Sequence, residues 1–272
     1  MIVADLESAV FGRFQPGRSF MHKLDPRTKL LAVIGLVVAV FGSQTYAGIA
    51  LSALLVLVAC AASRISPKTI AKATAPLLII AAIAVILNVF FTQGGEVYVS
   101  WGFITISERG VNAALLAACR LTVLLTGATL LTLTTAILDI TEAFERLLSP
   151  LAKIGLPAHE LGMMMGIALR FLPQFASEAR IIHRAQISRG ASFGSGALSG
   201  GIGAIGALLV PLFTSAFRHA ETLALAMDAR CYHGGAGRTR LEPLAFGMRD
   251  AAAAALLACV IVCTFALNIV LG

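Results

Sequence analysis

Residues 30–62 read LLAVIGLVVAVFGSQTYAGIALSALLVLVACAA, and this long apolar run decides the class of fold. As a single helix it would reach about 50 Å, which exceeds the roughly 30 Å hydrocarbon core of a bilayer. Gly42-Ser43-Gln44-Thr45 interrupts the run. We therefore predict a hairpin of two short membrane helices over residues 30–41 and 46–62.

Three further apolar runs predict three further spans, at Pro76–Phe91, Gly110–Thr135 and Arg249–Leu271. Pro76 suits a first helical turn, where its missing N–H costs nothing. A polar loop over residues 93–109 joins the first two of these spans, with a short extended piece around residues 97–99. The chain is thus predicted to be an all-α integral membrane protein with about five transmembrane helices.

The composition fits this class. Of the 272 residues, 58% are hydrophobic and 13% are charged, whereas a soluble domain carries roughly 25% charged residues. The net charge of +7 would suit nucleic acid, anionic lipid or an acidic protein. The aromatic residues are mostly Phe inside apolar runs, which argues against nucleic acid as a partner. Five cysteines form no CxxC pair, so neither a disulfide framework nor a zinc site is expected.

The pattern changes after residue 138, which sets the predicted domains. They are an N-terminal membrane domain of four spans over 1–138, a cytoplasmic coupling-helix region over 139–240 and a C-terminal membrane span within 241–272. The first 28 residues are polar and contain Pro16 and Pro26, so we expect no cleaved signal peptide.

Two long helices in the middle region have the same design. One is predicted to open at Pro173 and end in Ser188-Arg189-Gly190, and the other to open at Pro211 and end in Ala229-Arg230-Cys231. Small neighbours let the backbone of a partner approach each arginine, and a guanidinium group offers a rigid fork for carboxylates. The alternative is that each arginine only complements the dipole of its helix C-terminus.

The placement of lysine and arginine predicts the orientation. Of 21 such residues, five precede residue 30, three lie in 63–72 and eleven lie in 141–249, which leaves only Arg109 and Arg120. With the N-terminus in the cytoplasm, four spans return the chain to the cytoplasm, and the outer loops hold only Arg109. We therefore expect a multi-pass protein with a cytoplasmic N-terminus.

Other motifs in the sequence provide weaker evidence of function. Residues 201–206 match GxGxxG but lack the preceding strand and the following acidic residue of a dinucleotide site, so close helix packing is the better interpretation. His159-Glu160 is half of a metalloprotease motif whose second histidine position is Met163. No GxxxxGK[ST] loop for nucleotide phosphates occurs.

Arg120 and Asn88 lie within predicted spans, and we favour a structural role for Arg120, paired with helix ends or carbonyls inside the bundle.

Several stretches of the chain form a specific combination. In chain order they are Pro16-Gly17-Arg18-Ser19, His22-Lys23-Leu24-Asp25-Pro26-Arg27-Thr28-Lys29-Leu30, Thr134-Thr135, Arg170-Phe171-Leu172-Pro173, Ala185-Gln186-Ile187-Ser188-Arg189-Gly190, Ala226-Met227-Asp228-Ala229-Arg230-Cys231-Tyr232 and Gly237-Arg238-Thr239. With these stretches, which extend over nearly the whole chain, the sequence resembles the EcfT/CbiQ family. Its members are the transmembrane components of energy-coupling factor (ECF) importers of bacterial cell membranes.

The resemblance implies a mechanism. Family members dock two small-Arg-small helix ends into grooves on a pair of ABC-type ATPases, and they hold a small substrate-binding membrane (S) subunit for a vitamin or a transition-metal ion. The implied ATPase-coupling residues are Ser188, Arg189, Gly190, Ala229, Arg230 and Cys231. The suggested contacts with the S subunit are Met163, Met164, Met165 and Phe171. Ser188, where many relatives have Ala, and Cys231 are mild departures from the family pattern.

The same resemblance implies that this chain holds no catalytic residue, cofactor or metal, and that ATP and Mg are used by the partner ATPases. Two other functions stay open on the residues alone. A self-sufficient permease would need a broken-helix site or inverted repeats near the midplane. The interruption at Pro211 and the Gly-rich segment before it could be such a site, but the arginine-tipped helices would then be unexplained. An intramembrane transferase or protease would need polar groups clustered at one depth, where only Arg120 and Asn88 qualify.

Overall fold

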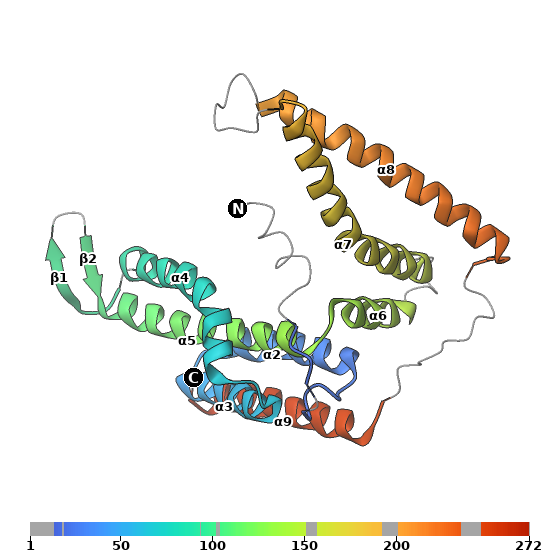
Figure 1. The fold of residues 1–272 in the computed structure, drawn as a ribbon. Coiled ribbons are helices and arrows are strands. Elements are labelled where there is room, and N and C mark those ends of the chain that lie inside the picture. The colour runs from blue at the N-terminus through green and yellow to red at the C-terminus, as the bar shows by residue number, and fades with distance from the viewer. Residues whose placement is uncertain are drawn as a thin grey trace. The chain divides into compact units, whose positions relative to one another are not determined.

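The computed structural model describes residues 14–17, 19–92, 94–101, 104–150, 157–191, 201–234 and 246–271. These residues form eight helices and one two-stranded sheet (Figure 1). The elements are α2 (Pro26–Gly42), α3 (Tyr46–Ser63), α4 (Pro67–Phe91), β1 (Val97–Trp101), β2 (Ile104–Ser107), α5 (Glu108–Thr134), α6 (Ile137–Leu148), α7 (Ala158–Ser188), α8 (Gly201–Ala229) and α9 (Met248–Leu271). They divide into two compact units. The membrane unit contains the described residues of 14–143 and 246–271, and the α7–α8 unit contains those of 144–234.

The opening hairpin is formed as predicted. Asp25 caps α2 by accepting a hydrogen bond from the backbone N–H of Arg27 at 2.9 Å, and Pro26 fills the first turn without losing a hydrogen bond. Ser43 and Thr45 take extended backbone conformations between the two helices. The prediction of two helices interrupted at residues 42–45 is therefore confirmed.

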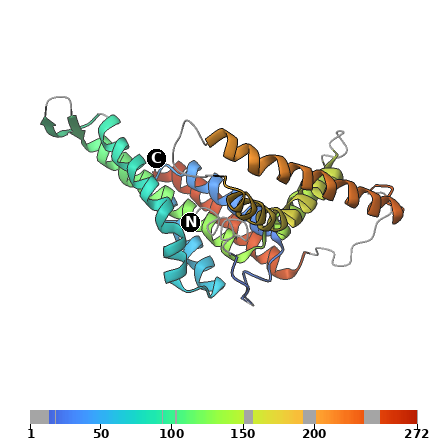
Figure 2. The ribbon, with the colours of Figure 1, turned by 45° about the horizontal axis from the view of Figure 1, so that its top comes forward.

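The helices α4 and α5 lie side by side and carry the β1–β2 hairpin at one end (Figure 2). The extended piece predicted around residues 97–99 is part of β1, which pairs antiparallel with β2. The predicted start of α4 is wrong, since the helix begins at Pro67 and Pro76 lies inside it. An internal proline removes one backbone hydrogen bond and bends a helix. The helix nevertheless continues through Pro76, with apolar residues on the far side of the bend.

Glycines allow α2 to approach α9 closely at the centre of the membrane unit. A Cβ atom on Gly35 would lie 2.7 Å from Leu257 Cδ2, and one on Gly42 would lie 2.9 Å from Phe265 Cζ. Small residues serve this purpose in membrane bundles, where helix association depends on close packing. The buried apolar core beside α2 consists of Leu36, Val40, Ile49, Val56 and Val123.

Four helices of the described chain, α3, α4, α5 and α9, are long and apolar enough to cross a membrane. The helix α2 has 17 residues, or about 25 Å, the lower end of what a bilayer requires. Its ends bond to the two ends of α9: the Asp25 N–H donates to Asp250 at 2.8 Å, and Asn268 donates to the Gly42 carbonyl at 2.6 Å. Between these two contacts α2 runs alongside α9 from one end to the other, as expected of a membrane span. It corresponds to the first of the five spans predicted from the sequence.

The helices of the α7–α8 unit are longer than predicted. Pro173 lies inside α7, which begins at Ala158, and Pro211 lies inside α8, which begins at Gly201. The prediction that these prolines open their helices is wrong for the same reason as at Pro76. Figure 1 shows α7 changing direction along its length, as expected of an internal proline.

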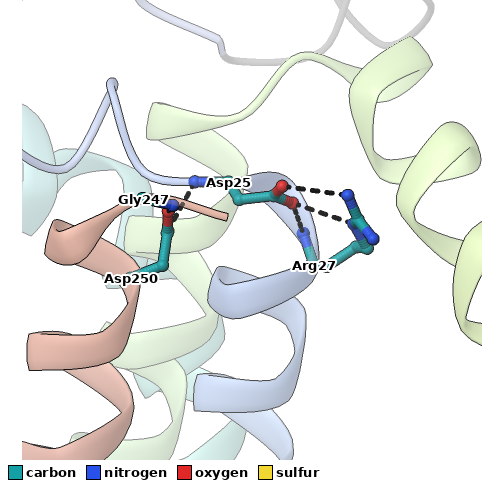
Figure 3. Close-up of polar contacts among 4 residues, drawn as sticks. All are labelled: Asp25, Arg27, Gly247 and Asp250. Atoms are coloured by element: carbon teal, nitrogen blue, oxygen red, sulfur yellow. Dashed lines mark hydrogen bonds and ion pairs between the residues drawn. The ribbon is translucent and has the colours of Figure 1, made fainter. Parts of the chain in front are cut away.

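A hydrogen-bonded network of polar groups closes one end of the membrane unit (Figure 3). The Asp250 carboxylate accepts the backbone N–H groups of Asp25 at 2.8 Å and Gly247 at 2.9 Å. Asp25 in turn pairs with the Arg27 guanidinium at 3.2 Å. Asp250 thus joins the start of α2 to the start of α9 through two backbone donors, of which the N–H of Asp25 is buried.

Lys29 extends this network to α5. Its side chain is buried, with the residue 5% exposed, and Nζ donates to the Thr134 carbonyl at the end of α5 at 3.0 Å. The carboxylates of Asp25, Asp139 and Asp250 act electrostatically on this ammonium group. Three helix ends that are distant in the sequence are therefore held together by side chains.

The network predicts the effect of removing Asp250. Asp250→Ala should lower the free energy of unfolding by about 1–3 kcal/mol, because it leaves the buried N–H of Asp25 without its acceptor. SDS-induced unfolding of the protein in detergent micelles measures this loss. Asp250→Asn keeps one acceptor oxygen and should lose less, and Glu96→Ala, at an exposed acidic residue, should lose almost nothing. Equal losses in Asp250→Ala and Glu96→Ala would contradict the assignment.

Candidate functional site

The helices α7 and α8 form an antiparallel pair. The side-chain amide of Gln186 donates to the Ala207 carbonyl at 3.2 Å, and the side chain of Gln174 bonds to that of His219 at 3.2 Å. As the residue number falls along α7 it rises equally along α8, so the register is constant over these contacts. Figure 1 accordingly shows the end of α7 beside the start of α8.

A compact polar and aromatic cluster fixes this register. Ser215 donates a short hydrogen bond to Glu178, whose second oxygen lies 3.5 Å from His219 Nε2. The His219 ring also stacks with Phe171, at 5.9 Å between ring centroids, and lies 5.9 Å from the ring of Phe175. Because these side chains are directional partners, the two helices are held in one alignment at this crossing.

The end of α7 is closed by a Schellman turn. The Gly190 N–H donates to the Ile187 carbonyl at 2.9 Å, and the Ala191 N–H donates to the Gln186 carbonyl at 2.9 Å. Gly190 supplies the left-handed backbone that this turn requires, with φ of 87°. Arg189 is the residue that immediately precedes the turn glycine, at the cap position.

The end of α8 repeats this turn position by position. The Cys231 N–H donates to the Asp228 carbonyl at 2.8 Å, and the Tyr232 N–H donates to the Met227 carbonyl at 3.1 Å. Cys231 takes the place of the glycine, with φ of 55°. Arg230 therefore occupies the position that Arg189 has in α7.

The two turns explain why a small residue follows each arginine. That residue must adopt a left-handed conformation, which favours glycine. Both arginine side chains are exposed, and within the described chain neither makes an ion pair. The backbone of each turn already pairs the last carbonyls of its helix, so the arginines are not needed as caps.

The antiparallel register places the two arginines at opposite ends of the helix pair. Continuing the pairing of residue 186 with 207 puts Arg189 opposite residue 204 of α8. Arg230 lies 26 residues further along the chain, which corresponds to about 40 Å of helix. The α7–α8 unit thus presents two separate, similarly built cationic tips.

The four residues suggested for contact with an S subunit lie on α7 but differ in exposure. Met164 and Met165 are exposed, at 53% and 39% of their surface. Met163 is half-buried, and Phe171 is half-buried in the stack with Phe175 and His219. Met164 and Met165 are therefore more accessible to a partner than Met163 and Phe171.

The polar residues within the predicted spans have structural contacts. Arg120 donates to the Ser43 carbonyl just beyond the end of α2, at 2.5 Å, which agrees with the role favoured from the sequence. The Asn88 amide oxygen accepts a hydrogen bond from Thr92 at 3.1 Å near the end of α4. Among the described residues, no group of three or more His, Cys, Asp or Glu side chains is placed to hold a metal ion.

Sequence reasoning missed the clustering of Lys29 and Asp250. Both lie at the first turns of apolar helices, and acidic or basic residues at such positions are a usable signal for contacts at the end of a bundle. The hydrogen bond that brings Asp250 to the start of α2 joins it to Asp25, 225 positions away in the sequence, which no local pattern indicates.

The turn at Cys231 generates a prediction. Cys231→Gly should keep the turn and relieve a left-handed strain of about 1–2 kcal/mol, so the amides of residues 231 and 232 should exchange hydrogen more slowly. Cys231→Val should open the turn and speed their exchange. Hydrogen–deuterium exchange measured by mass spectrometry distinguishes the two, with Gly190→Val as the matched variant on α7. Unchanged exchange in Cys231→Val would contradict the assignment of the turn.

Comparison with known proteins gives the same family as the sequence motifs. The family model CbiQ, described as cobalt transport protein, matches residues 17–241. The energy-coupling factor transporter transmembrane protein EcfT of Brevibacillus brevis is 45% identical over 90% of this chain and 92% of its own length. The EcfT proteins of Ruminiclostridium cellulolyticum and Clostridium kluyveri are 42% and 41% identical, over 90% and 95% of this chain and 91% and 96% of their own lengths. The chain therefore belongs to the EcfT/CbiQ family, the transmembrane components of energy-coupling factor transporters.

Proposed function

We propose that this chain transmits ATP-driven motion from two ABC-type ATPase subunits to a substrate-binding membrane (S) subunit. The observation that carries the proposal is the pair of identical Schellman turns at opposite ends of the α7–α8 pair, each presenting an exposed arginine. The ATPases would bind and hydrolyse ATP with Mg, and this chain would contribute no catalytic residue. The imported solute would be a vitamin or a transition-metal ion held by the S subunit.

The two tips suit docking into acidic grooves of partner proteins. A guanidinium group pairs with carboxylates through two parallel hydrogen bonds, which fixes orientation as well as position. The Schellman turn holds the backbone at each tip in one conformation, so little order is lost on binding. Ser188, Gly190, Ala229 and Cys231 leave room for the walls of a groove around each arginine.

The separation of the tips supports two partners rather than one. About 40 Å between them corresponds to the diameter of a small domain or more, so each tip would meet its own ATPase. A movement of the two ATPases toward each other would then act on opposite ends of one antiparallel helix pair.

The apolar surface of α7 and α8 supports a further partner in the membrane. Large apolar side chains are exposed on both helices, namely Met164, Met165, Leu172, Ile181, Ile187, Leu209, Val210, Phe213, Phe217 and Leu225. A surface of this extent marks a contact with protein or lipid, and methionine adapts to different partner shapes. We assign Met163, Met164, Met165 and Phe171 to the S-subunit side of this contact.

Removal of both arginines tests the proposal. Arg189→Ala combined with Arg230→Ala should abolish solute uptake and release the ATPases, since truncating one partner of a buried charge pair costs about 2–5 kcal/mol. Co-purification of the ATPases with the membrane-inserted protein measures the release. Arg218→Ala, at an exposed arginine in the interior of α8, is the matched control and should retain both uptake and ATPases. Normal uptake in the double variant, or uptake by this chain alone in vesicles as for a permease, would contradict the proposal.

The proposed topology places the N-terminus and the α7–α8 unit in the cytoplasm of a bacterium. In intact cells, a membrane-impermeant maleimide should not reach Cys231, although this residue is exposed. The same reagent should label Glu96→Cys in a Cys231→Ser background, because the β1–β2 end of the membrane unit would face outward. Cys231 should react once the cells are lysed. Labelling of Cys231 before lysis would reverse the orientation.

A further inference from the structure

We propose that the membrane unit binds one anionic phospholipid, with an acyl chain in an apolar cavity among α2, α3, α5 and α9 and its phosphate beside Arg64. The inference is independent of ATPase docking, because it uses only residues of the membrane unit. It rests on two adjacent cavities of opposite character.

The first cavity has a volume of about 250 Å³ and lies between membrane-spanning helices. Its walls are almost wholly apolar, with Ala59 and Ala62 of α3, Leu130 of α5 and Leu257 of α9 among them. Five of its twenty lining residues are alanines and a sixth is Gly127, so small side chains leave part of the space open. An apolar cavity of this kind does not hold water, and within a bilayer the available apolar occupant is an acyl chain.

The second cavity, of about 300 Å³, is polar and lies next to the first. It is lined by Gln15, Pro16, Gly17, Ser19, His22, Ser63, Arg64, Ile65 and Ser66. Phe20 and Met21 line the apolar cavity, whereas the flanking Ser19 and His22 line the polar one. At the end of α3, Ala62 faces the first cavity and Ser63 the second. Neighbouring residues thus divide one site into an apolar and a polar half, as in an amphiphile.

Arg64 is the group in the polar half that is available to an anion. It caps α3 with a left-handed backbone, φ 55°, and its N–H donates to the Ala61 carbonyl. The side chain is exposed, and in the part of the chain that the structure describes it makes no ion pair. His22 is already occupied, since its ring bonds to the Ser19 hydroxyl at 2.7 Å and the Gln15 carbonyl at 2.9 Å.

Lys29, the cation at the polar edge of the apolar cavity, does not serve as the phosphate site. Its ammonium group donates to the Thr134 carbonyl and is subject to the electrostatic attraction of the carboxylates of Asp25, Asp139 and Asp250. These negative charges oppose the binding of an anion. Among the residues that the structure describes, no carboxylate pairs with the guanidinium of Arg64, and Lys68, exposed in the first turn of α4, adds a second positive charge. Basic pockets at the ends of membrane helices bind anionic lipid head groups in this way.

Native mass spectrometry of the purified protein with phosphatidylglycerol or phosphatidylcholine tests the site. Arg64→Gln should lower the retention of the tightest-bound phosphatidylglycerol about fivefold and leave phosphatidylcholine unchanged. Ala59→Leu, which fills the apolar cavity, should lower the retention of both lipids. Arg109→Gln removes an exposed arginine at the other end of α5 and should change neither.

Circular dichroism shows that each variant is folded, and Ala62→Leu replaces Ala59→Leu if the latter does not fold. Wild-type retention of phosphatidylglycerol in Arg64→Gln, or of both lipids in the cavity-filling variant, overturns the proposal. An equal loss in Arg64→Gln and Arg109→Gln also overturns it, because the lipid would then be held by general surface charge.

Discussion

The structure depends on how helix ends are satisfied where water is scarce. A helix leaves N–H groups unpaired at its start and carbonyls unpaired at its end, and a bilayer offers them no partners. In the membrane unit other helices supply the partners: Asp250 accepts the Asp25 N–H, Lys29 donates to the Thr134 carbonyl, and Arg120 donates to the carbonyl just beyond α2. These charged side chains therefore contact the ends of helices, and Arg120 does so from the interior of α5.

The α7–α8 unit pairs its helix ends locally, and the function proposed for it rests on that difference. Backbone turns pair the last carbonyls of α7 and α8, so no side chain from another helix is required there. At such an end the turn fixes the backbone of the arginine through main-chain hydrogen bonds and uses none of the donors of its side chain. The alternative that Arg189 and Arg230 only complement helix dipoles explains their positions but not the repetition of the whole turn, including the strained Cys231.

The sequence was a good guide wherever the cause of structure is local. The interruption at residues 42–45 and the ends of the two arginine-tipped helices could be predicted from composition and spacing. For Arg120 only a structural role could be favoured, because its partner, the Ser43 carbonyl, lies 77 residues away in the sequence. The proline boundaries could not be predicted, because Pro76, Pro173 and Pro211 each remove only one backbone hydrogen bond from a helix that continues on both sides. The left-handed conformation of Cys231 was equally hidden, since that residue type gives no signal for it.

The position of Pro173 gives α7 two mechanically different halves. Beyond it, the contacts of Gln174, Glu178 and Gln186 with α8 join the two helices into one body that includes the Arg189 tip. Before it lies the exposed Met164 region. A proline lacks the N–H that would bond the preceding turn, so the backbone bends more easily there than within the clamped segment. In the proposed mechanism, displacement of an arginine tip would therefore move the clamped pair as a unit and change the angle at Pro173. The face offered to a membrane partner would turn while both helices stay intact.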